Sequence, residues 1–257
     1  MKDKVIFDVG AYNGIDGLAL AIKNPKFKIY AFEPNPFLIE EITSNKLKFE
    51  KRIGKKILNY KLIEKAVSSE NTFGNFFISK NPTGSSLKRF SDNLDETWPG
   101  YREAHFHVVK TIKVEIITLE KFLLDNKIEF INYLHIDTQG NDLNVLKGLG
   151  RFKNKVGKGI LEAAVDKDKS LYKNNHTVED VKNFFKTTGY SIEQIKPIDS
   201  NIKNEVNINF KNKNYINLLN ISTNYNVRYY ARVVNGNTYF KDDIKDFLLK
   251  IINFFIK

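Results

Sequence analysis

Two short segments with acids and glycines follow the first two apolar runs of the chain. The first run, Val5–Val9, contains Asp8 and continues into the turn 10–14, which begins and ends with glycine. The second run ends at Glu33, about 20 residues after this turn. Glycines allow a tight turn and a close backbone approach, and an acid at this spacing commonly binds ribose hydroxyls. Together the two segments predict a nucleoside site.

The residues of the turn also indicate which nucleoside it suits. A dinucleotide fingerprint has a glycine where this chain has Tyr12, because the backbone must approach a pyrophosphate there. Asp8 and Asp16 flank the turn and would repel a diphosphate at a helix start. No Gly-Lys-Ser/Thr follows, so a Walker-type loop is excluded. S-adenosylmethionine fits better, because it lacks phosphate, carries positive sulfonium and ammonium groups and offers a ribose diol to Glu33.

Three later residues are candidates for proton handling. His135 and Asp137 lie two apart in a buried run, so they project to one face of a strand. The imidazole could act as general base toward a hydroxyl, oriented by Asp137, and Glu162 on the next run is a further candidate acid. Each of the three could also be only a packed structural group. A metal site built from Asp137, Asp142 and a histidine lacks supporting spacing, and none is predicted.

Composition restricts the class of protein. The net charge of +11 suggests nucleic acid, but it comes from 35 Lys and only 6 Arg, scattered along the chain among 30 Asn. We therefore expect a solvated surface, since Arg is the usual reader of phosphates and guanine edges. The absence of cysteine excludes disulfides and thiolate chemistry and favours a reducing compartment, the cytoplasm. No apolar run predicts a signal peptide or a transmembrane helix.

Strands and helices alternate along most of the chain. Apolar periodicity predicts strands at 5–9, 28–32, 60–67, 74–79, 112–117, 132–138, 159–165, 192–198 and 215–221. Helices are expected at 14–23, 34–50, 119–124, 142–149 and 177–188. This alternation predicts a single α/β domain over 1–223, with a mostly parallel, doubly wound sheet flanked by helices. We expect the strand at 74–79 to be a hairpin return from the strand before it.

Two segments depart from the alternation. Residues 80–107 are polar and contain turn residues, which predicts a mobile insert over one end of the sheet. Its aromatic side chains and nearby arginines could form an acceptor lid or an ordinary surface loop: Trp98, Tyr101, Phe106, Arg89 and Arg102. Residues 224–257 form a C-terminal extension, with an amphipathic helix expected at 242–257. Such a helix could pack on the domain or on a second subunit in a homo-oligomer, or contact a membrane surface weakly.

Several short motifs, in order, resemble those of the FkbM-type methyltransferases. They are Asp8-Val9-Gly10-Ala11-x-x-Gly14, Phe32-Glu33-Pro34, Ala66-Val67-Ser68, Gly84-Ser85-Ser86-Leu87, Ile136-Asp137-Thr138-Gln139-Gly140 and Val145-Leu146-Lys147-Gly148. Each is weak alone, but their order and spacing are specific, and the resemblance covers residues 4–195. It implies a Rossmann-like class I fold and an S-adenosylmethionine-dependent enzyme, typically an O-methyltransferase of sugar or polyketide hydroxyls.

The resemblance also implies roles for individual residues. The methionine part of the cofactor would lie against the glycine turn with its carboxylate near Asn13, the ribose would bind Glu33, and adenine would lie beside Ala66 and Val67. The full set of expected cofactor contacts is Asp8, Gly10, Ala11, Asn13, Gly14, Glu33, Pro34, Ala66, Val67, Ser85 and Asp137. One departure concerns the segment after Asp137, where the family usually has Val-Glu-Gly and this chain has Thr138-Gln139-Gly140.

These patterns favour methyl transfer to a sugar, glycan or small-molecule hydroxyl. An RNA methyltransferase is the alternative that the charge suggests. Base-amino methylation is disfavoured, because the Asn/Asp-Pro-Pro-aromatic motif is absent after Ile136. A non-catalytic nucleoside-binding domain is the third alternative, which binding assays would distinguish.

Overall fold

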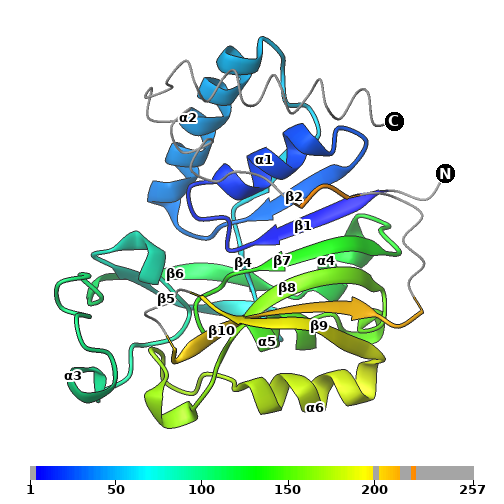
Figure 1. The fold of residues 1–257 in the computed structure, drawn as a ribbon. Helices are drawn as coiled ribbons and strands as arrows, with labels where there is room; N and C mark the ends of the chain where they lie inside the picture. Colours follow the sequence, from blue (N-terminus) through cyan, green and yellow to red (C-terminus); the bar gives the residue numbers. More distant parts are fainter. Residues whose placement is uncertain (1–3, 199–202, 215–220, 224–257) are drawn as a thin grey trace.

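The protein is an α/β domain built on a large twisted sheet, as the computed structural model in Figure 1 shows for residues 4–198, 203–214 and 221–223. The larger sheet has seven strands in the order β3-β2-β1-β7-β8-β10-β9, and a smaller sheet has the order β4-β6-β5. In the larger sheet β10 is antiparallel to both of its neighbours, and the other pairings are parallel. The mostly parallel, doubly wound fold is therefore confirmed. The strands are β1 (Val5–Val9), β2 (Lys28–Phe32), β3 (Tyr60–Ile63), β4 (Ala66–Val67), β5 (Thr72–Ser79), β6 (Val108–Ile117), β7 (Ile131–Ile136), β8 (Val156–Ala164), β9 (Tyr190–Pro197) and β10 (Glu205–Asn212).

Helices cover the large sheet from both sides. In Figure 1, α1 (Ile15–Lys23) and α2 (Pro36–Ile53) lie on one side, and α5 (Asp142–Lys147) and α6 (Val178–Thr188) on the other. The helix α4 (Leu119–Asp125) precedes β7. The strand order reverses between β1 and β7, which pair in parallel. Right-handed crossovers on each side of such a switch point leave a crevice at the carboxyl ends of the two strands.

Local sequence signals set the helix boundaries next to the crevice. Gly14 begins α1 in the left-handed conformation, with φ of 78°. Asn35 caps α2 by accepting a hydrogen bond from the amide of Phe37, and Pro36 occupies the first helical position. Thr177 and Asp180 form the capping box that begins α6, as the sequence suggested. Most of these signals are short-range, so the sequence alone could identify them.

The structure corrects the predicted strands in three places. The single strand expected at 60–67 is two strands in different sheets, because the amide of Lys65 turns back to the carbonyl of Ile63 at 2.9 Å. The strand at 74–79 is part of β5, which pairs with β6 across the insert instead of returning beside the preceding strand. Strand β10 was not predicted. The predicted strand at 215–221 and helix at 242–257 lie, apart from residue 221, outside the described residues.

The insert 80–107 is folded onto the domain, in contrast to the mobile loop predicted for it. It contains a short 3-10 turn, Pro82–Gly84, and a short helix, α3 (Leu94–Thr97). The indole Nε1 of Trp98 donates to the carbonyl of Lys169 at 2.8 Å. Its aromatic side chains form a small hydrophobic cluster with the segment after β8, comprising Phe90, Leu94, Trp98, Tyr101, Phe106, Leu171 and Tyr172. These side chains are used for packing.

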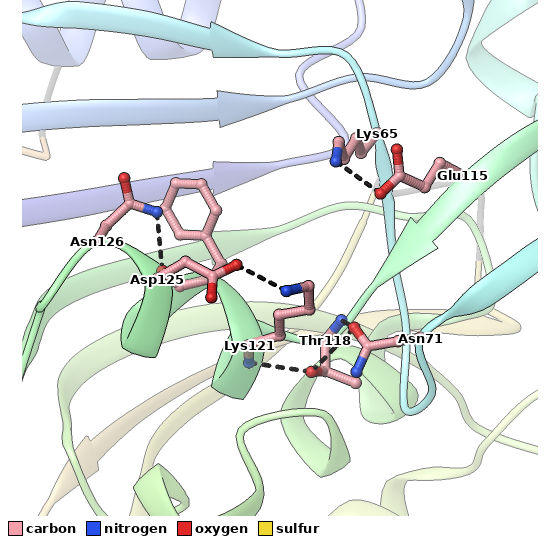
Figure 2. A network of polar contacts seen from close by, with 8 residues as sticks. Lys65, Asn71, Glu115, Thr118, Lys121, Asp125 and Asn126 are labelled. Atoms are coloured by element: carbon pink, nitrogen blue, oxygen red, sulfur yellow. Dashed lines mark hydrogen bonds and ion pairs between the residues drawn. The ribbon is translucent and has the colours of Figure 1, made fainter.

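Polar contacts attach the smaller sheet to the larger one, as Figure 2 shows. The side-chain oxygen of Asn71 accepts a hydrogen bond from the amide of Thr118 at 2.8 Å, and Thr118 in turn caps α4 at the amide of Lys121. Lys65 and Glu115 form an ion pair at 2.6 Å next to the β4–β6 pairing. These contacts fix the position of β4 relative to the crevice. Among the described residues, no helix has the length and apolar character needed to cross a membrane.

Candidate cofactor site

A pocket with a volume of about 840 Å³ opens at the carboxyl ends of β1, β2 and β7. It lies at the switch point, where ligands bind in open α/β sheets. The segment between β3 and β4 and the start of the insert complete its wall. Ten of the predicted site residues line it: Asp8, Gly10, Ala11, Glu33, Pro34, Ala66, Val67, Ser85, His135 and Asp137. The sequence therefore located the pocket correctly.

The glycine turn is held against the ends of two strands. The amides of Gly10 and Ala11 both donate to the carbonyl of Phe32 at 3.0 Å, and the amide of Asp137 donates to the carbonyl of Val9 at 2.9 Å. Gly10 has φ of +85°, and a Cβ atom there would lie only 1.8 Å from the carbonyl oxygen of Asp137. Position 10 therefore requires glycine for two reasons, its backbone conformation and the close approach of β7.

Glu33 presents a buried carboxyl group to the pocket. Its Oε2 accepts from the amide of Tyr12 and its Oε1 from the amide of Asn35, each at 2.9 Å. Burial raises the pKa of Glu33 to about 8, the two amides counteract this, and the charges of Asp8 and Asp137 add to it. Each carboxylate oxygen keeps a further lone pair. The group is thus fixed in orientation and able to accept two more hydrogen bonds, as a ribose diol requires.

Asn13 and Gly14 do not line the pocket, although the sequence placed them among the cofactor contacts. The Oδ1 of Asn13 accepts from the amide of Ile15 at 3.2 Å, and its carbonyl accepts from Asn45 at 2.9 Å. A Cβ atom on Gly14 would lie 2.9 Å from the side chain of Ile42. Both residues shape the start of α1, so the pocket gives no support for a contact between Asn13 and the cofactor.

His135 lies beside the pocket as the partner of Asp8. Its Nδ1 is 2.8 Å from the Oδ1 of Asp8, which is buried, while 22% of the His135 side chain is exposed. The orienting acid is therefore Asp8, on the neighbouring strand, and not Asp137 as the sequence suggested. Burial of the ring lowers the pKa of His135, but the hydrogen bond and charge of Asp8, with Asp16 and Asp137, outweigh it and raise the pKa to about 9.

Asp137 is fixed by a residue whose role the sequence did not reveal. Gln139, with φ of 56°, donates from Nε2 to the Oδ1 of Asp137 at 2.6 Å. Its Oε1 lies 2.9 Å from the hydroxyl of Tyr172, which also contacts the carbonyl of Gly84 at 3.1 Å. Burial raises the pKa of Asp137, and His135 and the Gln139 hydrogen bond lower it. An amide in place of the family's usual glutamate therefore links the catalytic edge to the insert.

Glu162 lies outside the pocket lining, behind Asp142. The amide of Glu162 donates to the Oδ2 of Asp142 at 2.7 Å, and the Oδ1 of Asp142 accepts from the amide of Thr138 at 2.8 Å. Burial raises the pKa of Glu162, and the charges of Asp137, Asp142 and Glu205 raise it further. Asp142 therefore braces the loop after β7. In the part of the chain that the structure describes, no group of three or more acids or histidines is arranged to hold a metal ion.

The pocket lining is rich in acids. Asp8, Asp16, Glu33 and Asp137 contribute carboxyl groups, and Lys65, which also lines the pocket, forms an ion pair with Glu115 (Figure 2). A ligand with positive charge and a diol suits this lining, so the residues present fit S-adenosylmethionine. The sequence analysis did not assign further lining residues to the site: Tyr12, Asp16, Leu38, Lys65, Phe76, Pro82, Thr83, Leu87, Thr138, Gln139 and Asn141.

Different signals could have found some of these residues. Tyr12 and Asp16 lie in or just after the glycine turn, and Thr138, Gln139 and Asn141 follow Asp137, so proximity to a motif was available. Phe76 had no such signal, because it reaches the pocket only through the pairing of β5 with β6. The aromatic residues expected in an acceptor lid do not line the pocket; Trp98, Tyr101 and Phe106 pack in the insert's own cluster.

Comparison with known proteins agrees with this site. The chain matches the model of the methyltransferase FkbM domain over residues 8–192. No curated protein matches it. Among solved structures it is similar to the FkbM methyltransferase from Methylobacillus flagellatus, with 12% identity over 80% of this chain and 43% of that one and a TM-score of 0.48. The chain thus spans less than half the length of that relative.

Two further solved structures have comparable similarity. One is M. capricolum TrmK in complex with S-adenosyl-homocysteine, with 14% identity over 86% of this chain and 68% of that one and a TM-score of 0.42. The other is the Methanococcus jannaschii fibrillarin pre-rRNA processing protein, with 13% identity over 82% and 66% of the two chains and a TM-score of 0.44. The family match covers most of the chain and includes both motifs that form the pocket. The chain therefore belongs to the FkbM methyltransferase domain family, and its domain is that of an S-adenosylmethionine-dependent methyltransferase.

Proposed function

We propose that this protein transfers the methyl group of S-adenosylmethionine to a hydroxyl group of a sugar, glycan or small molecule. The observation that carries the proposal is the Asp8–His135 pair at the edge of the cofactor pocket. A hydroxyl acceptor must lose a proton as its oxygen gains carbon, and an imidazole fixed by a carboxylate is suited to take it. The cofactor, when bound, supplies an electrophilic methyl group on a sulfonium.

The residues of the chain divide the remaining tasks. Glu33 accepts hydrogen bonds from the ribose, and Gly10 and Ala11 allow the backbone to approach the methionine part. Gln139 fixes the carboxyl group of Asp137 at the end of β7, where we place the reacting groups. Positioning of this kind supplies much of the rate enhancement in a displacement between two bound groups. The pocket lining gives Glu162 no direct contact with the reactants, so we propose a structural role for it.

The net charge of +11 keeps an RNA acceptor as a second candidate. The test is transfer of a labelled methyl group from S-adenosylmethionine to fractionated glycans, small metabolites and RNA. Label in an alkali-stable ether on a glycan or metabolite supports the proposal, and label confined to RNA contradicts it. The His135→Gln variant should lose most of the transfer, and full turnover by this variant would remove His135 as the base. A cytoplasmic location and a homo-oligomer stay predictions, as do contacts of the C-terminal extension.

A further inference from the structure

The strongest further inference concerns the charge of the pocket through the reaction, and it rests on the proposed function. His135 is held by Asp8 at 2.8 Å, and both line the pocket that fits the cofactor. Further carboxyl groups face this pair from every neighbouring element. Asp16 lies in the first turn of α1, Asp137 follows β7, and Glu162 lies on β8 two residues beyond Ile160, the strand partner of His135.

Such an environment attracts positive charge. The carboxyl groups stabilise a protonated His135, which explains why its pKa is raised to about 9 although the ring is largely buried. A sulfonium bound in the same pocket would compete for the same negative charges. It would also repel a protonated imidazole, since like charges in a partly desolvated site disfavour each other.

We propose that His135 and the sulfonium of S-adenosylmethionine take turns in carrying one positive charge in this pocket. His135 is protonated in the free protein and releases its proton when S-adenosylmethionine binds. The neutral imidazole, whose Nδ1 faces Asp8, then offers Nε2 to the acceptor. It is protonated again in the complex with the product S-adenosylhomocysteine, whose thioether is neutral.

The charge and atom balance of the reaction supports this exchange. A carbon–oxygen bond forms at the acceptor, the carbon–sulfur bond breaks, and its electron pair stays on sulfur. The hydroxyl proton passes to Nε2 of His135. One positive charge therefore leaves sulfur as one appears on the imidazole, and the net charge between Asp8, Asp16 and Asp137 stays constant. Cofactor binding thus converts His135 from an acid into a base.

Proton-linked binding measurements test the proposal without turnover. Isothermal titration calorimetry of S-adenosylmethionine and of S-adenosylhomocysteine, in buffers with different ionisation enthalpies, gives the protons released by each. We expect S-adenosylmethionine to release up to one proton more at pH 7.5–8.5. The ratio of its Kd to that of S-adenosylhomocysteine should fall several-fold, at most about tenfold, per pH unit between pH 7 and 9. Protons linked to Glu33 cancel, because both ligands carry the same ribose.

Variants assign the effect to His135. The His135→Gln variant should bind S-adenosylhomocysteine, which shows that it is folded, and should lose the difference in proton release. The matched control is His176→Gln, which changes a histidine outside the pocket and should keep the difference. A ring-proton NMR titration of His135, assigned by its loss in His135→Gln, should shift to lower pH with S-adenosylmethionine only.

The outcomes separate this inference from the proposed function. Equal proton release by the two ligands, or a difference that persists in His135→Gln, overturns the exchange of charge while leaving cofactor binding intact. Failure of both ligands to bind contradicts the methyltransferase function itself.

Discussion

Gly10 and the carbonyl oxygen of Asp137 approach so closely that a Cβ atom on residue 10 would lie 1.8 Å from that oxygen. This contact joins the turn after β1 to the end of β7, the two strands that flank the switch point. It explains why the glycine belongs to the cofactor site even though it has no side chain to contribute. It also gives the first prediction a clean control.

Gly10→Ala should destabilise the protein by at least about 2 kcal/mol more than Gly100→Ala, because overpacking adds to backbone strain. The two glycines have nearly the same φ, +85° and +88°, but a Cβ atom on Gly100 would meet nothing within 4 Å. Urea denaturation measures both variants, and titration with S-adenosylhomocysteine should show that Gly10→Ala alone loses affinity. Equal losses of stability would mean that the close approach is unimportant.

Glu33→Gln should weaken the binding of S-adenosylhomocysteine by about tenfold or more, because removing an ionised acceptor from a buried hydrogen bond costs roughly 1–3 kcal/mol. The amide nitrogen would also have to face the amide of Tyr12 or Asn35, which are both donors. Glu33→Ala should act in the same direction. Glu40→Gln, on the exposed side of α2, is the matched control in calorimetry. Unchanged affinity in Glu33→Gln would reject a ribose contact.

Gln139→Glu should make the stability of the protein depend on pH. The new carboxyl group would lie 2.6 Å from that of Asp137, so the native state must retain a proton that the unfolded chain releases. A pKa raised on folding contributes stability that is present at low pH and is lost as pH rises. The melting temperature should therefore change little at pH 5 and fall by several degrees at pH 8. Gln194→Glu, on exposed β9, should not show this divergence.

Glu205→Gln should make the free energy of unfolding less sensitive to pH around neutrality. Burial raises the pKa of Glu205 to about 7, and Asp142 and Asp137 add to the shift. Its stabilising contribution is therefore present below the pKa of an unfolded glutamate and is lost as pH rises through about 7. Denaturant titrations at pH 5 and pH 8 should show a smaller decrease for the variant than for the parent. Glu70→Gln, at an exposed position, should keep the full decrease.

The sequence by itself determined the features that depend on short-range chemistry. The glycine turn, the acid at Glu33 and the alternation of apolar runs predicted the doubly wound sheet and most of its cofactor pocket. They could do so because a strand end, a tight turn and a helix cap each require particular residues within a few positions. The order of these motifs also carried the resemblance to the FkbM family.

Tertiary structure decided the partners across the sheet. Asp8 orients His135 although 127 positions separate them, and Gln139 meets Tyr172 from a segment beyond the next strand. Nothing in the periodicity of either segment encodes such a contact, because strand order and register are set by the packing of the whole sheet. For the same reason the splitting of 60–67 between two sheets, and the packing of the insert's aromatic residues, became visible only in the folded chain.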